Sequence, residues 1–245
     1  MTIARRPFLA FAAVSGLAAP VLARAADVVR GSGVSTTERR EVGAFSGVAL
    51  GGPFAVVLRP AAREGLEITA DDNVLPLVET TVRGSGDERT LRIDLARSAR
   101  IEPRTKVVVT VDMVKIGHLA VGGSGTIDGK AIKSAKLDVG IGGSGAIGLD
   151  ALDVDELAVA IGGSGSFRAS GRARKLGVNI GGSGHSDTER LAAADVSVAV
   201  AGSGDARVRA DNALSASIAG SGDVYYTGAA SPHVAIVGSG RIKKI

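Results

Sequence analysis

Large apolar residues alternate with small or polar residues through the second half of the chain. One stretch reads Leu157-Ala158-Val159-Ala160-Ile161 and is followed at once by Gly-Gly-Ser-Gly. Successive side chains of a strand point to opposite faces, so Leu157, Val159 and Ile161 share one face. This period of two predicts a β-strand with one buried face, whereas an amphipathic helix would need a period of 3.6.

A Gly-Ser-Gly tripeptide closes each alternating stretch. It occurs seven times in the second half of the chain, and consecutive copies there begin about 20 residues apart. Such a period is typical of a solenoid, in which each repeat buries its apolar face against its neighbours. We predict an all-β parallel β-helix with rungs of about 18–20 residues, each bending at its tripeptide. The predicted bends are Gly123-Ser124-Gly125, Gly143-Ser144-Gly145, Gly163-Ser164-Gly165, Gly182-Ser183-Gly184, Gly202-Ser203-Gly204, Gly220-Ser221-Gly222 and Gly238-Ser239-Gly240.

The alternation places both glycines of a tripeptide on the inward side and the serine on the outward side. Two missing side chains would let the wall bend sharply or let the opposite wall come close. We expect the serine hydroxyls to satisfy backbone groups at the bend rather than to form a functional ladder.

The outward residues differ between the two strands of a rung. After each bend they are mostly charged or large (Asp128, Arg168, Asp187, Arg207, Arg209, Tyr225 and Lys243), and we name this surface the charged wall. Before each bend they are small and uncharged, although a solvent-facing sheet normally carries charged or long polar side chains. We hypothesise that this second surface, the bare wall, is covered by the N-terminal region, another subunit or a foreign partner. Its representative residues are Ala120, Gly140, Ala160, Ala199 and Ala219.

The residue after each tripeptide supplies the best candidate for chemistry. If the rungs stack in register, His185, Asp205, Asp223 and Arg241 form an outward line at steps of about 4.8 Å. Two stacked carboxylates could hold Ca²⁺ or act as an acid/base pair on a polysaccharide. The alternative is that Asp205 and Asp223 cap the bend by bonding the backbone, which short polar residues favour. We predict no catalytic residue, no resident metal and no cofactor.

The first part of the chain lacks the repeat. We expect residues 26–41 to be irregular and residues 42–112 to form strands that are either early rungs or a cap on the stack. Solenoids need caps to hide their terminal core and strand edges, and the sequence leaves both arrangements open. Residues 113–245 form the predicted repeat domain.

Residues 1–25 have the composition of a cleaved export signal. Arg5 and Arg6 precede an apolar stretch, and Ala23-Arg24-Ala25 is a small-x-small cleavage site. The paired arginines also resemble the twin-arginine motif, so the sequence is compatible with export by either the twin-arginine or the general secretory route. We therefore expect a periplasmic, extracellular or surface-associated protein.

Charge and composition exclude several function classes. Residues 1–25 hold three of the 29 Lys and Arg residues and none of the 25 Asp and Glu residues, which leaves a net charge of +1. That balance does not indicate a nucleic-acid partner. The chain has no cysteine, which excludes disulfides and cysteine-based chemistry. No later apolar run reaches the length of a membrane span.

Three features together resemble one family. They are Phe45-Ser46-Gly47-Val48 with the alternation that follows it, Ala70-Asp71-Asp72-Asn73, and the serial Gly-Ser-Gly repeats. The chain is similar over about residues 42–245 to the auto-transporter adhesin, head GIN-domain family. The resemblance implies a right-handed, pectin-lyase-like parallel β-helix and a role in cell adhesion. It supplies no catalytic motif.

These observations predict an exported, non-catalytic solenoid that binds a surface, protein or glycan ligand through a rigid repetitive face. The first alternative is a polysaccharide-binding or polysaccharide-active β-helix that uses the Asp205/Asp223 edge. The scarcity of aromatic residues, five Phe and two Tyr with no Trp, argues against a sugar platform. The second alternative is a self-assembling envelope component, in which the bare wall makes a homo-oligomer.

Overall fold

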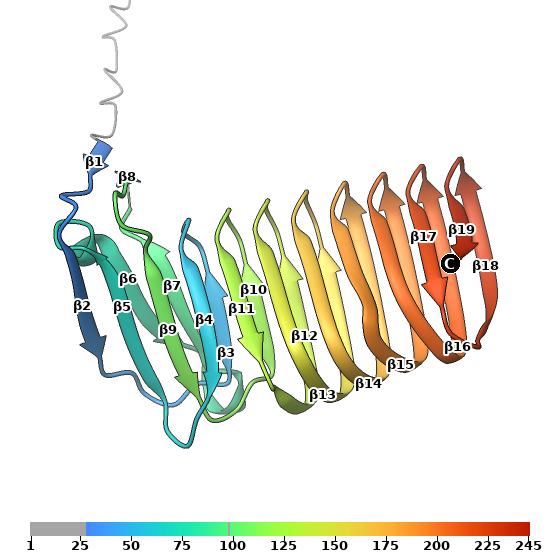
Figure 1. The fold of residues 1–245 in the computed structure, drawn as a ribbon, viewed down its shortest axis with the longest axis horizontal. Helices are drawn as coiled ribbons and strands as arrows, with labels where there is room; N and C mark the ends of the chain where they lie inside the picture. Colours follow the sequence, from blue (N-terminus) through green and yellow to red (C-terminus); the bar gives the residue numbers. More distant parts are fainter. Residues whose placement is uncertain (1–27, 98) are drawn as a thin grey trace, which may run out of the picture.

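The computed structural model describes residues 28–97 and 99–245, and in them the chain forms a β-solenoid (Figure 1). Besides strands, this part of the chain contains two single-turn 3-10 helices, η1 (Leu75–Leu77) and η2 (Gly86–Glu88). The export signal predicted at residues 1–25 lies outside the described residues. The expectation of an all-β parallel solenoid is confirmed.

The repeat region consists of parallel strands that stack one rung on the next. In chain order they are β10 (His118–Val121), β11 (Thr126–Lys130), β12 (Lys133–Ile141), β13 (Ala146–Ile161), β14 (Ser166–Gly182), β15 (His185–Gly202), β16 (Asp205–Gly220), β17 (Asp223–Thr227), β18 (Ser231–Gly238) and β19 (Arg241–Lys244). The bare wall contains β10, β12, the second halves of β13 to β16, and β18. The charged wall contains β11, the first halves of β13 to β16, β17 and β19.

The core lies between the two walls and is built from columns of identical register. Leu137 pairs with Leu157 and Leu157 with Leu176, so residues one repeat apart lie directly over each other. The members of this column are at most 4% exposed; they are Leu119, Leu137, Leu157, Leu176, Val196 and Leu214. The hydrophobic effect from burying such columns is the main contribution to the stability of the stack.

The bends at the tripeptides lie along the upper edge of the stack in Figure 1, between β18 and β19 for the last one. A Cβ on Gly145 would lie 2.4 Å from Cγ1 of Val121 and 2.5 Å from the carbonyl oxygen of Gly125. Glycine is therefore needed because the preceding rung approaches closely, and not because the opposite wall does. The second glycine of each tripeptide is buried, and the first is half-buried in all but the last repeat.

The serines of the tripeptides do not act as expected. Their side chains are exposed, and within the described residues the seven hydroxyls make no hydrogen bond to the protein. The backbone makes the contact instead: the N–H of Ser144, for example, donates to the carbonyl of Gly123 at 3.1 Å. The backbone ladder itself satisfies the bend, so the hydroxyls remain free to face solvent.

The lower edge of the stack absorbs the variation in rung length. Register shifts occur there between Leu149 and Leu152, and between Thr188 and Ala192. The upper bends have no such shifts, so repeats of unequal length still align at every tripeptide.

Residues 42–112 extend both walls of the solenoid. Strand β3 (Gly47–Leu50) is parallel to β10, and β4 (Ala55–Pro60) is parallel to β11, so these two strands form a rung. Beyond them, β7 (Thr90–Leu95) is parallel to β3, and β9 (Val108–Met113) is parallel to β4. The segment therefore supplies early rungs.

The same segment also supplies a cap. Strands β5 (Gly65–Asp71) and β6 (Val78–Arg83) are antiparallel to their neighbours β9 and β7. Strand β2 (Ser35–Arg40) adds a further antiparallel strand to β5, and β1 (Val28–Arg30) pairs with β8 (Arg100–Glu102). Two strands thus lie in residues 26–41, which were expected to be irregular. The sequence of β2 has no apolar alternation because this edge strand exposes most of its side chains.

Candidate functional site: the bare wall and its rim

The bare wall presents its outward residues as three columns that run along the stack. The middle column is Ala49, Ala120, Gly140, Ala160, Asn179, Ala199, Ser217 and Ala235. The column beside the tripeptide bends includes Gly122, Gly142, Gly162, Gly181, Ala201, Ala219 and Val237. The column beside the lower bends is His118, Asp138, Ala158, Gly177, Ser197, Ser215 and His233.

Four of the five residues predicted to mark this face therefore lie in one column. Ala219 is on the same face but pairs with Ala201, so it lies one outward position nearer the bend. Ala160 and Ala219 are exposed, and Ala120, Gly140 and Ala199 are half-buried.

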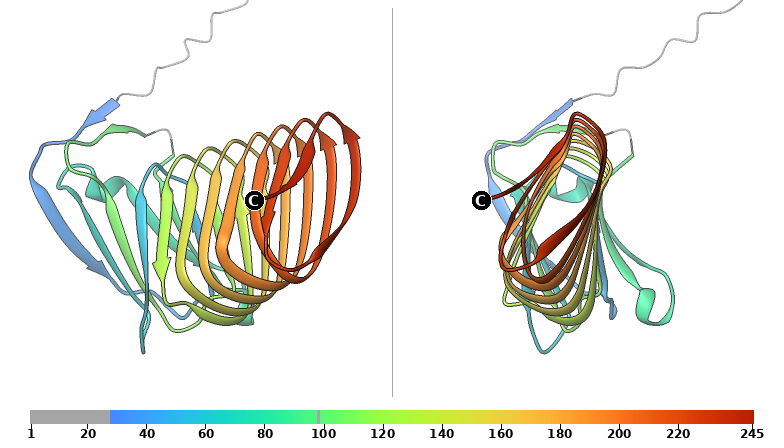
Figure 2. Two further views of the ribbon diagram at one scale, coloured as in Figure 1. Left: turned by 45° about the vertical axis from the view of Figure 1, so that its right-hand side comes forward. Right: turned by 90° about the vertical axis from the view of Figure 1, so that its right-hand side faces the viewer.

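The N-terminal region does not cover the bare wall within the described residues. Strands β3 and β7 continue the wall past β10 instead of folding over it (Figure 2). Where β7 begins, the outward residues become charged, with an ion pair of 3.1 Å between Arg92 and Asp94. The middle column is therefore uncharged from β3 to β18, whereas the column beside the lower bends contains Asp138. Of the three hypothetical partners for the bare wall, another subunit and a foreign partner remain.

A shallow hollow of about 720 Å³ lies on the bare wall beside the lower bends. Its floor contains Ala158, Gly177, Ser197 and Ser215, which are all small. Longer side chains line one edge of the hollow. They belong to the residues that precede the inward leucines and valine, and these residues point outward. The hollow therefore follows from small floor residues beside a longer-chain edge.

That edge carries a row of alternating charge. Lys136, Glu156, Lys175 and Asp195 lie in direct register on β12 to β15, so the signs along the stack read plus, minus, plus, minus. We name these four residues the charged rim. Lys136 Nζ lies 3.2 Å from Asp138 Oδ2, and Asp195 Oδ1 accepts a hydrogen bond of 2.7 Å from Asn212 Nδ2. Glu156 and Lys175 are exposed and form no ion pair with another described residue.

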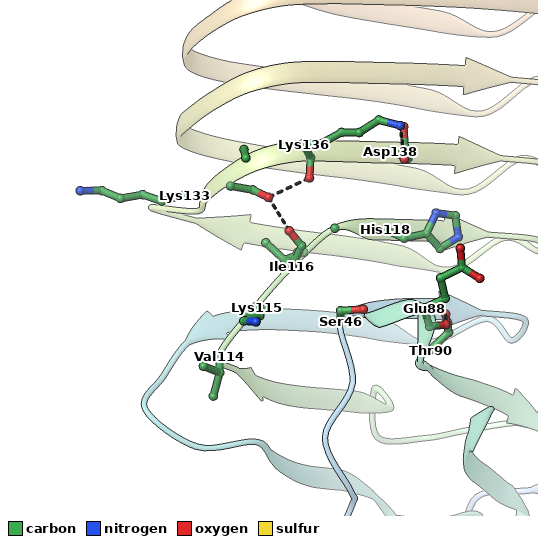
Figure 3. Close-up of a pocket in the computed structure, with 13 residues that line it drawn as sticks. Ser46, Glu88, Thr90, Val114, Lys115, Ile116, His118, Lys133, Lys136 and Asp138 are labelled. Carbon is green, nitrogen blue, oxygen red and sulfur yellow. Dashed lines mark hydrogen bonds and ion pairs between the residues drawn. The ribbon is translucent and has the colours of Figure 1, made fainter. Parts of the chain in front are cut away.

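A second hollow of about 830 Å³ lies where the cap meets the stack (Figure 3). Thr90, His118 and Asp138 line it, and Lys136 extends toward Asp138 at its upper side. Asp138 is in register with Ala158, and Lys136 is in register with Glu156. The two hollows therefore lie next to each other along the same column.

The four residues proposed as an outward line do lie in one column of the charged wall. His185 pairs with Asp205, and Asp223 pairs with Arg241. Asp205 Oδ1 accepts the backbone N–H of Asp223 at 2.9 Å, and Asp223 Oδ1 accepts that of Arg241 at 3.0 Å. His185 Nδ1 lies 3.8 Å from Asp205 Oδ2. Each carboxylate thus bonds the backbone of the following rung, which is a capping geometry.

Metal ligation finds little support in this column. In residues 28–97 and 99–245 no group of three or more His, Asp or Glu side chains is arranged to hold a metal ion. Binding of Ca²⁺ between Asp205 and Asp223 stays a prediction that calcium titration can test.

The lower bend carries the best-formed ion pair of the stack. Arg172 Nε and Nη2 donate to the two oxygens of Asp153, each at 2.7 Å. The hydrogen bond from Arg172 lowers the pKa of Asp153 below its ordinary value, against the opposing effect of desolvation. The same pair raises the pKa of Arg172. Both groups are solvent-accessible, so the pair orders the bend more than it stabilises the fold.

The charged rim was not identified from the sequence. Its members are each one repeat apart, and each stands directly before a residue of the inward column Leu137, Leu157, Leu176 and Val196. An alignment of the repeats at that position would have revealed the alternation of sign.

The fold defines an all-β parallel solenoid with a charged wall and a bare wall of mostly small residues. Within that class, the chain belongs to the family described as "putative auto-transporter adhesin, head GIN domain", whose model matches residues 44–230. The family and the fold support a binding or adhesion-like role and suggest an exported or cell-surface protein. A search of curated proteins found no match. No helix in residues 28–97 or 99–245 is long and apolar enough to cross a membrane.

Solved structures share the fold over most of the chain. A protein described as a putative adhesin from Bacteroides fragilis is 21% identical, with a TM-score of 0.81, covering 89% of this chain and 100% of that one. A protein described as a putative lipid binding protein from Parabacteroides distasonis is 22% identical, with a TM-score of 0.74 and the same coverage. A putative adhesin from Parabacteroides distasonis is 25% identical, with a TM-score of 0.69 and the same coverage.

Proposed function

We propose that the protein is an exported, non-catalytic binding protein that makes adhesive contacts through its bare wall. One observation carries this proposal: three outward columns on eight stacked strands hold mostly Ala, Gly and Ser, and their few larger members include His118, Asp138, His233 and Val237. A sheet face that remained in contact with water would carry charged or long polar side chains, as the charged wall does.

Small side chains also make the bare wall suited to contact. Glycine and alanine have no side-chain rotamers to lose on binding, so ordering this surface costs little conformational entropy. A partner can approach the backbone closely over several rungs. The rigidity of the stacked rungs fixes the shape of the surface before binding.

The polysaccharide alternative has weaker support. Asp205 and Asp223 already accept backbone hydrogen bonds. Tyr225, the one outward aromatic ring of the adjacent column, lies under the guanidinium of Arg207 at 5.6 Å. Its face on that side is therefore not available to stack on a sugar ring.

The test is a binding assay with beads that carry the purified protein. They are offered to beads coated with the same protein and to a glycan array. We expect binding to at least one of these, and we expect Ala160→Arg to abolish it because a long charged side chain would stand in the middle column. Ser166→Arg, an exposed position on the charged wall, is the matched control and should bind normally. Failure of the wild type to bind either probe, or full binding by Ala160→Arg, would refute the proposal.

A further inference from the structure

We propose that the bare wall pairs face to face with the bare wall of a second copy of this chain, with the two stacks running in opposite directions. This inference rests on the proposed function of the wall as a contact surface and names its occupant. The pairing is isologous: a two-fold axis lies between the walls, parallel to the strands, and passes between β13 and β14.

The order of charge along the rim carries the inference. A two-fold axis parallel to the strands reverses the order of the rungs but keeps the rim opposite the rim. Lys136 of one copy then faces Asp195 of the other, and Glu156 faces Lys175. A row that reads plus, minus, plus, minus is complementary to its own reversal, so each of these contacts occurs twice. Such complementarity fixes register and partner choice.

The position of the axis agrees with the extent of the bare wall. Four strands of the wall lie on one side of it (β3, β10, β12 and β13) and four on the other (β14, β15, β16 and β18). Reversal about this axis therefore places all eight strands opposite one another. In the middle column Ala160 then faces Asn179, and Gly140 faces Ala199. No long side chain of that column obstructs close approach.

The size of the wall is sufficient for a stable dimer. Three outward positions on each of eight strands, about 4.8 Å apart across strands and about 6.7 Å apart along them, give a planar face of roughly 770 Å². Standard protein interfaces bury about 800 Å² per partner. The hollow beside the rim gives the long Lys175 and Glu156 side chains of the opposing copy space to occupy. The small net charge of the chain beyond residue 25 adds little repulsion between copies.

Two charge reversals and their mixture test the pairing by light scattering over a range of concentrations. We expect the wild type to be a dimer that weakens at high salt. Lys175→Glu should raise its dissociation constant roughly tenfold or more, because two Glu–Glu contacts replace two ion pairs. Glu156→Lys should do the same with two Lys–Lys contacts. An equimolar mixture of these two variants should form a heterodimer, since Glu156 then faces Lys175 and the two introduced charges face each other.

The mixture is the decisive arm, since neither a foreign partner nor misfolding of a variant would produce rescue. A monomeric wild type, a dimer unaffected by either reversal, or a mixture that stays monomeric would overturn the inference. If the wild type is monomeric while Ala160→Arg still abolishes glycan binding, the wall remains a contact surface and only its occupant changes. If a dimer resists both the charge reversals and Ala160→Arg, neither proposal stands.

Discussion

The repeat stack and the N-terminal cap are held together by different kinds of contact. In the stack, each rung satisfies the same requirements as the rung before it: an apolar column inside, a glycine where the backbones approach, and a parallel backbone ladder. In the cap, antiparallel strands and loops depend on individual polar side chains. Asp71 is the main example, because it is fully buried and no other carboxylate in the described residues is.

The Asp71 carboxylate joins three segments of the cap. Its oxygens accept the backbone N–H groups of Gly33 at 3.0 Å, Arg104 at 2.8 Å and Thr105 at 3.1 Å. Asn73 adds a hydrogen bond of 2.8 Å from Nδ2 to the carbonyl of Arg30. The difference between the two regions is one of redundancy: a stack contact is repeated in other rungs, whereas the contacts of Asp71 occur once.

The largest effect is expected from a glycine of the stack. A Cβ on Gly204 would lie 2.4 Å from the carbonyl oxygen of Gly184 and 2.6 Å from Cγ2 of Ile180. Because the backbone cannot withdraw without opening the ladder, we expect Gly204→Ala to lower the free energy of unfolding by about 3 kcal/mol or more. Urea denaturation measures this change.

The matched control for that substitution is Gly177→Ala. A Cβ at Gly177 would meet no atom within 4 Å, because this glycine faces outward on the bare wall. We expect this substitution to change the free energy of unfolding by no more than about 0.5 kcal/mol. Equal losses for the two variants would mean that glycine is required throughout the repeat for conformational reasons and not for close approach at the bend.

An intermediate effect, confined to the cap, is expected from Asp71→Asn. The amide would direct an N–H group toward backbone donors, so at least one of the three segments would be released. We expect faster amide exchange at Gly33 and Arg104 and unchanged exchange in β14 and β15. Thr36→Val, at an exposed position of β2, is the control. Uniformly faster exchange across the stack would show that cap and stack unfold as one unit.

The same residue makes the cap sensitive to acid. Burial would raise the pKa of Asp71, but hydrogen bonds from Thr105, Arg104 and Gly33 outweigh it and hold the pKa below its ordinary value. The contribution to stability is therefore complete above the unfolded value of about 3.9 and is lost as the pH falls through the folded pKa. Below about pH 4, we expect the free energy of unfolding to fall more steeply for the wild type than for Asp71→Asn, as measured by urea denaturation. Parallel curves for the two proteins would contradict this.

The contrast also explains what the sequence could predict. The strands of the stack and their facing columns repeat, so one strand with its bend, such as residues 157–165, predicts the corresponding parts of the other rungs. The cap could not be predicted in this way, because β2 is an exposed edge strand without alternation and Asp71 acts on residues 38 and 33 positions away. The bare wall followed from the repeat. The charged rim could not be predicted from one rung, because the sign of its charge changes from rung to rung. Only an alignment of the rungs shows that these residues form a row.

The smallest effect is expected where one rung departs from the apolar column. Ser186 is 1% exposed and lies in register with Phe167 and Ala206, and its hydroxyl has no hydrogen-bond partner in the described residues. Thr188 faces the same core, but its hydroxyl donates to the carbonyl of Arg207 at 3.0 Å.

Substitutions at these two residues distinguish the free-energy cost of a buried unsatisfied hydroxyl from the stabilisation by a buried hydrogen-bonded one. We expect Ser186→Ala to stabilise the protein by about 1 kcal/mol, because it removes a buried hydroxyl that has lost its water and gained no partner. Thr188→Val, of nearly the same shape, should destabilise by about 1 kcal/mol, because it leaves the Arg207 carbonyl without its donor. Urea denaturation of both variants checks the sign. If both substitutions destabilise equally, the Ser186 hydroxyl has a partner in solution, and the core of this rung admits a water molecule that the stack elsewhere excludes.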